Sequence, residues 1–118
     1  MFRCPDRLRV FIVLALILPS GRLAWGHPPA TIELQYDSQT KVLHAEIGHV
    51  THDQKGHHIR RLYVYKNDAP IENFPYAKQT TSTTLVQDVP MEASSGDVIR
   101  VKAVCSEAGY KEETLIIP

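Results

Sequence analysis

The stretch VLHAEIGH, residues 42–49, alternates apolar and polar side chains from Leu43 to its end. Because successive side chains of a strand point to opposite faces of a sheet, this alternation predicts a half-buried β-strand. His49 falls at the end of the apolar face. His44 falls among the polar side chains, which indicates a histidine exposed to solvent on the outer face.

Similar short patterns recur along the chain, and no long helical period appears. The Asn67-Asp68 pair suits a hairpin turn, and Pro75 limits its own segment to the edge of a sheet. About seven short antiparallel strands in ~90 residues predict an all-β, immunoglobulin-like β-sandwich. The other predicted strands are residues 31–36, 59–66, 71–76, 80–86, 98–105 and 113–117.

The beginning of the chain has the pattern of a secretory signal peptide. Three arginines precede an apolar run at residues 10–18, which is far shorter than the roughly 20 residues that a membrane span needs. Ala24 and Gly26 meet the preference for small residues before a cleavage site. We therefore expect residues 1–26 to be removed before His27, and the product to be periplasmic or secreted with no membrane span.

The expected mature chain, residues 27–118, is long enough for one small domain. Of the 13 basic and 13 acidic residues in the full sequence, four arginines and Asp6 lie in the signal peptide, which leaves 9 basic and 12 acidic residues. This balance argues against a nucleic-acid partner. Cys105 is then the one cysteine, so an internal disulfide is excluded, and burial, an intermolecular bond or a metal remain open for its thiol.

Four of the six histidines lie close together in the sequence, at His49, His52, His57 and His58. The first ends a predicted strand and the third precedes the next strand, so the loop between them can bring both rings to one rim of the sandwich. Cys105 ends another inward-facing pattern. Imidazole and thiolate ligands suit iron, copper or zinc better than calcium or magnesium. The pattern predicts a transition-metal site, with a solvated polar loop as the alternative.

The segment AEIGHVTHDQKGHHIRRL, residues 45–62, resembles the iron-domain signature of the desulfoferrodoxins and neelaredoxins, which are superoxide reductases. Its most specific part is GHHIR, residues 56–60. The segment HPPATI, residues 27–32, resembles the family segment in which the first ligand histidine lies ahead of the first strand. The sequence VCSEAG, residues 104–109, is similar to the family's Cys-Asn-x-His-Gly motif. The resemblance implies an immunoglobulin-like sandwich, in agreement with the strand pattern.

The resemblance also implies a mononuclear, non-haem Fe(II) site with imidazoles around the metal and an axial thiolate. The loop from His52 to His57 is one residue shorter than in the family, so His49 and His58 are also candidate ligands. Ala108 stands where the family has its last ligand histidine, so the ligand set is incomplete. The metal ligands carried over from the family are His27, His49 or His52, His57, and Cys105.

The function implied by the resemblance is that of an exported oxidoreductase that reduces superoxide to peroxide with electrons from a separate donor. One alternative is a periplasmic copper carrier without catalysis, in which the free α-amine and the imidazole of His27 chelate the metal. Another is a metal-free interaction domain that uses Tyr63 and Tyr65 as a binding surface. The sequence leaves the redox partner and the oligomeric state open.

Overall fold

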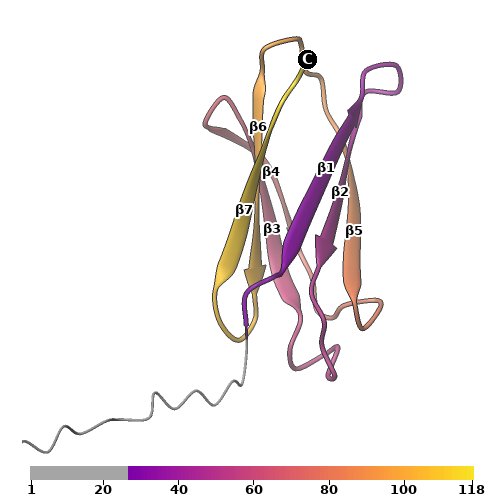
Figure 1. Cartoon of the computed structure of the whole chain (residues 1–118), viewed down its shortest axis with the longest axis vertical. Helices are drawn as coiled ribbons and strands as arrows, with labels where there is room; N and C mark the ends of the chain where they lie inside the picture. The colour runs from indigo at the N-terminus through magenta and orange to yellow at the C-terminus, as the bar shows by residue number, and fades with distance from the viewer. Residues whose placement is uncertain (1–26) are drawn as a thin grey trace, which may run out of the picture.

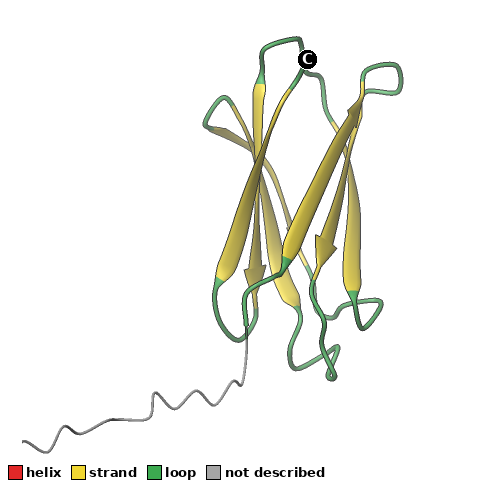
Figure 2. Cartoon of the chain, in the orientation of Figure 1, coloured by secondary structure: helices red, strands yellow, loops and turns green. Residues whose placement is uncertain are grey.

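The computed structural model describes residues 27–118, which form two antiparallel β-sheets packed face to face (Figure 1). One sheet has the order β1-β2-β5 and the other β4-β3-β6-β7. Figure 2 shows only strands and loops in this part of the chain, which confirms the predicted β-sandwich. The predicted signal peptide, residues 1–26, lies outside the described residues and stays a prediction. The strands are β1 (Thr31–Asp37), β2 (Val42–Gly48), β3 (Ile59–Lys66), β4 (Ala69–Pro75), β5 (Thr84–Pro90), β6 (Val98–Cys105) and β7 (Tyr110–Ile116).

The core consists of the alternate side chains that face inward from both sheets. In the smaller sheet, Leu43 and Ile47 of β2 lie beside Val89 and Leu85 of β5. Each fully buried aliphatic side chain stabilises the fold by about 1.5–3 kcal/mol. A slip of one residue would turn these side chains to solvent, so the core fixes the register of β2. The larger sheet contributes Ile59, Leu62, Val64, Ile99, Val101 and Ala103.

The turns explain where the strands begin and end. Asn67 and Asp68 both have positive φ, 52° and 69°, as the predicted hairpin between β3 and β4 requires. β5 begins at Thr84 and not at residue 80, because the hydroxyl of Thr81 accepts a hydrogen bond from the Thr84 N–H at 3.0 Å and forms a local turn. β7, in contrast, begins earlier than predicted, at Tyr110 and not at residue 113. β4 is an edge strand, as predicted.

One end of the sandwich collects four connecting segments. They are the segment before β1, the β2–β3 loop, the loop before β5 and the β6–β7 loop, all at the lower end in Figure 1. The Ala30 N–H donates to the Gly48 carbonyl at 2.8 Å, so the segment before β1 continues along β2. β1 also packs beside β7, while the carboxyl terminus lies at the opposite end. No helix within residues 27–118 could cross a membrane.

Candidate metal centre

Three histidines from separate segments converge at this end. His27 precedes β1, His49 follows β2 and His57 precedes β3, and one ring nitrogen from each lies within 4.8 Å of those of the other two. Their ring centroids are 4.7, 4.9 and 5.0 Å apart. A metal–nitrogen bond of about 2.0–2.1 Å places two ligand nitrogens up to about 4 Å apart. Small ring movements would therefore let all three bind one ion.

Two of these rings have an unpaired buried nitrogen. Nε2 of His49 and Nε2 of His57 are buried and have no hydrogen-bond partner among the described residues. Leaving a buried polar atom unpaired costs about 1–3 kcal/mol. A metal ion would satisfy both atoms at once. The donor set therefore fits a transition metal.

His49 is wholly buried. Its burial lowers its pKa below the usual value, and the nearby His57 and His27 rings act in the same direction, while the hydrogen bond to Gln79 and a polar contact with the His27 backbone oppose them. The folded protein thus favours the neutral imidazole, which is the form that binds metals. The position of His49 follows from the alternation of β2. Its backbone N–H donates to the Thr83 carbonyl at 2.9 Å.

Gln79 is a residue of this site that sequence reasoning missed. Its amide is wholly buried, and its Oε1 lies 2.8 Å from Nδ1 of His49. In the sequence it is one glutamine in a polar stretch, with no motif around it. Only the fold brings it against His49, so no local signal could have identified it.

A tight turn places His57. The carboxylate of Asp53 accepts hydrogen bonds from the Lys55 and Gly56 N–H groups at 3.2 and 2.9 Å, and the Asp53 carbonyl accepts from the His57 N–H at 2.8 Å. The two bonds to the carboxylate, with that of Gly56 the stronger, hold the pKa of Asp53 below its usual value. A Cβ on Gly56 would collide with the Asp53 carboxylate, so a larger residue there would displace the carboxylate that holds the turn.

His27 lies on the exposed segment before β1. Its Nδ1 is 3.1 Å from the Pro28 carbonyl, to which it can donate, and this leaves Nε2 as the nitrogen for a metal. Chelation by the α-amine and the same ring would use Nδ1, because only Nδ1 closes a small ring with the amine. The geometry of His27 therefore favours a site made by side chains alone.

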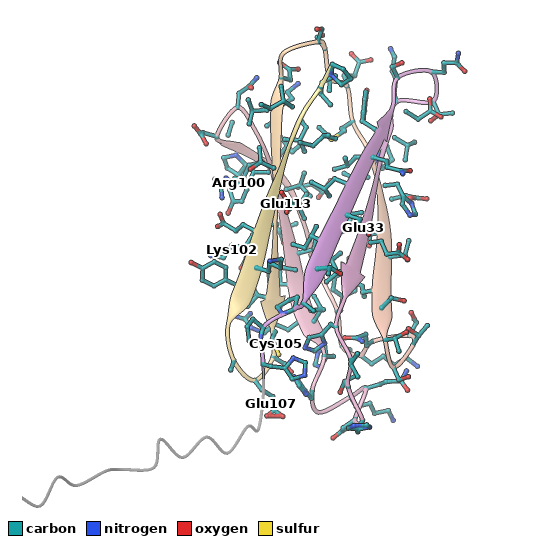
Figure 3. The ribbon with its side chains drawn as sticks, viewed as in Figure 1. Glu33, Arg100, Lys102, Cys105, Glu107 and Glu113 are labelled. Carbon is teal, nitrogen blue, oxygen red and sulfur yellow. The ribbon has the colours of Figure 1, made fainter. Side chains whose placement is uncertain are left out.

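Cys105 ends β6 at the same end of the sandwich, where Figure 3 labels it near Glu107. It is 4% exposed, its sulfur is a free thiol, and the Glu107 N–H donates to that sulfur at 3.4 Å. The neighbouring Ser106 is tied to His58 by two hydrogen bonds, at 2.8 and 3.0 Å. The structure brings Cys105 next to the segment of His57, but its sulfur is outside the group of nitrogens within 4.8 Å of one another.

The remaining histidines lie elsewhere. His52 is exposed and borders a hollow of about 600 Å³ that His27, His57 and Glu107 also line. Nε2 of His58 is 3.0 Å from the Tyr76 carbonyl. His44 pairs with Asp88 at 2.7 Å on the outer face, as its place in the alternation predicts. Neither His52 nor His58 belongs to the three-histidine group.

Comparisons with known proteins agree with the fold. The chain is similar to the superoxide reductase (neelaredoxin) from Ignicoccus hospitalis, with 16% identity and a TM-score of 0.50 over 77% of this chain and 79% of that one. Residues 27–118 share the fold of this neelaredoxin. Two single-substitution variants of that protein also match. One has a TM-score of 0.51 and 16% identity over 80% of this chain and 81% of that one. The other has a TM-score of 0.52 and 13% identity over 76% of this chain and 80% of that one.

No family model and no curated protein matches the sequence. At 13–16% identity, the similarity to neelaredoxin establishes the fold alone.

Proposed function

We propose that residues 27–118 hold a mononuclear non-haem iron and reduce superoxide to peroxide. The observation that carries the proposal is the convergence of His27, His49 and His57 at one end of a neelaredoxin-type sandwich, with a buried unpaired Nε2 on two of them. A structural polar cluster would pair these nitrogens with other protein groups. The approach of one ring nitrogen from each of the three histidines to within 4.8 Å of the other two instead supports a bound cation.

In this proposal the three histidines supply imidazole nitrogens and Cys105 supplies a thiolate. Its place at the end of β6, and the link between Ser106 and His58, support a fourth ligand from this strand. Iron held there would supply one electron to superoxide. Ala108 occupies the place of the last histidine of the resembling family, so this site has one imidazole fewer than the family pattern.

The hollow beside the histidines gives a small anion access to the site. His52 and Glu107 line it and are exposed. Superoxide needs one electron and two protons to become hydrogen peroxide. We propose that these two residues relay protons from solvent, while a separate one-electron donor restores the reduced state.

We also propose that residues 1–26 direct export and are removed before His27. The domain would then work in the periplasm or outside the cell. The acidic balance of residues 27–118 does not favour binding to nucleic acid or to an anionic membrane surface.

The test is to mix anaerobic, iron-loaded protein with a superoxide pulse in the absence of a donor. Reduction predicts one peroxide formed per iron oxidised and no release of dioxygen. His44→Ala is the matched control, because His44 lies on the outer face and should not alter the yield. Dioxygen released in equal amount with peroxide would indicate dismutation, and unreacted iron would also contradict the proposal.

A further inference from the structure

We infer that Gln79 is a positioning residue that selects the ring tautomer of His49 and so presents the Nε2 lone pair to a metal. The role of this tautomer in metal binding rests on the proposed metal centre, but the tautomer itself is a property of the metal-free protein. Gln79 contacts no substrate or metal in this account. It acts through His49.

The hydrogen bonds of Gln79 fix which end of its amide faces His49. Nε2 of Gln79 donates to the carbonyls of His49 and Thr81 at 2.7 and 3.1 Å, and both of these groups can only accept. Oε1 accepts from the Ile59 N–H at 3.3 Å, and this group can only donate. A flipped amide would break all three bonds, so Oε1 must face the His49 ring.

The tautomer of His49 follows from that orientation. Nδ1 of His49 lies 2.8 Å from Oε1 of Gln79, which is an acceptor, so Nδ1 must carry the proton. In a neutral imidazole the other nitrogen then bears the lone pair. That nitrogen, Nε2, is the buried atom without a hydrogen-bond partner, on a ring whose centroid is 5.0 Å from that of His27 and 4.7 Å from that of His57.

Gln79, in the loop before β5, also holds the middle of the β2–β3 loop, which carries both His49 and His57. The backbone N–H of Gln79 donates to the Gln54 carbonyl at 2.9 Å, and the side-chain Nε2 of Gln54 donates to the backbone carbonyl of Gln79 at 2.8 Å. Ile59, whose backbone N–H donates to Oε1 of Gln79, follows His57 by two positions. The side chain of Gln79 therefore orients the His49 ring, and its backbone ties the loop before β5 to the β2–β3 loop, from which both His49 and His57 project.

A glutamine that merely filled space would leave the tautomer unaffected, and this difference provides the test. Nitrogen-15 NMR of the imidazoles, in metal-free protein at pH 8, reports which nitrogen of each histidine carries the proton. We expect His49 to be protonated on Nδ1. His58 is the internal control with the opposite tautomer, because its Nε2 faces the Tyr76 carbonyl.

Two variants separate the acceptor from the volume of the side chain. Gln79→Glu keeps an acceptor and should keep the Nδ1–H tautomer of His49. Gln79→Met has a similar length but no comparable acceptor, and it should mix the tautomers of His49 and leave His58 unchanged. Affinity for Fe(II), measured anaerobically by competition with a coloured chelator, should fall about 10–100-fold in Gln79→Met and less in Gln79→Glu.

An Nε2–H tautomer of His49 in the unmodified protein would overturn the inference, whether or not any variant folds. An unchanged tautomer and affinity in Gln79→Met would also overturn it. If the tautomer depends on Gln79 but the unmodified protein retains no iron, the proposed metal centre fails while control of the tautomer by Gln79 is supported.

Discussion

The ring of Pro28 lies against the backbone of Gly109, so closely that a Cβ on Gly109 would stand 3.1 Å from Cβ of Pro28. Gly109 turns the chain between β6 and β7 with a φ of +78°. Pro28 directly follows His27. The β6–β7 loop therefore supports the segment that carries one of the three converging histidines.

Gly109→Ala should weaken both the fold and the metal site. The left-handed φ costs a residue with a Cβ about 1–2 kcal/mol, and the methyl group would displace Pro28 and with it His27. Gly96→Ala is the matched control, because Gly96 has a φ of +92° but no atom within 4 Å of the added Cβ. Both variants should lower the free energy of urea unfolding, and only Gly109→Ala should lower Fe(II) affinity. Equal affinities would show that this packing does not position His27.

An additional glycine ahead of His27 should leave metal affinity unchanged. Nδ1 of His27 is 3.1 Å from the Pro28 carbonyl, and this leaves Nε2, which cannot close a small chelate ring with the α-amine, for the metal. The measurement compares the affinities for Fe(II) and Cu(II) of protein that begins at His27 with those of the extended protein. A loss of Cu(II) binding on extension would support chelation by the amino terminus and a copper function.

Cys105→Ser should abolish the visible thiolate-to-iron charge-transfer band of the oxidised, iron-loaded protein, because the thiolate is the one sulfur ligand that residues 27–118 offer in the proposed site. Ala103→Ser is the control for placing a hydroxyl in the buried face of the same strand. It should keep the band. A spectrum that is the same in Cys105→Ser and in the unmodified protein would remove Cys105 from the ligand set.

Stability of the metal-free protein should decrease in mild acid. His49 has a lowered pKa in the folded protein, whereas in the unfolded chain it has an ordinary pKa of about 6.5. Below about pH 6.5 the unfolded state therefore binds more protons than the folded state. The stability that neutral His49 contributes is fully present above about pH 6.5. As the pH falls below that value, the free energy of unfolding decreases by up to about 1.4 kcal/mol per pH unit.

Urea unfolding between pH 8 and pH 5, with a chelator present, measures this dependence. His49→Leu should flatten the curve and His52→Ala, on the exposed loop, should not. The comparison uses the slope against pH, so that a constant loss of stability in His49→Leu does not affect it. An equally steep slope in His49→Leu would show that the acid sensitivity comes from other groups.

The strands could be predicted from the sequence because alternation depends on neighbouring residues. Residues 98–105 and 59–66 match β6 and β3 at both ends, and the inward face of β2 leads directly to His49. The start of β5 could not be predicted in this way. Its Thr-rich sequence suits a strand, but the bond between Thr81 and Thr84 forms a turn first.

The candidate site could be predicted only in part. The loop between β2 and β3 indicated that His49 and His57 would meet, and the structure brings them together with His27. The choice of His49 over His52 depends on which residue continues the inward face at the strand end. The roles of Gln79 and Gly109 depend on contacts between segments distant in sequence, which a local pattern does not contain.

The most direct test of the account is iron retention by protein that begins at His27 and is purified without an affinity metal. After incubation with one equivalent of Fe(II) and removal of loose metal, elemental analysis should find close to one iron per chain. The double variant His49→Ala/His57→Ala should retain almost none, and His44→Ala should retain as much as the unmodified protein. Little iron in the unmodified protein, or equal iron in the double variant, would contradict the three-histidine metal centre.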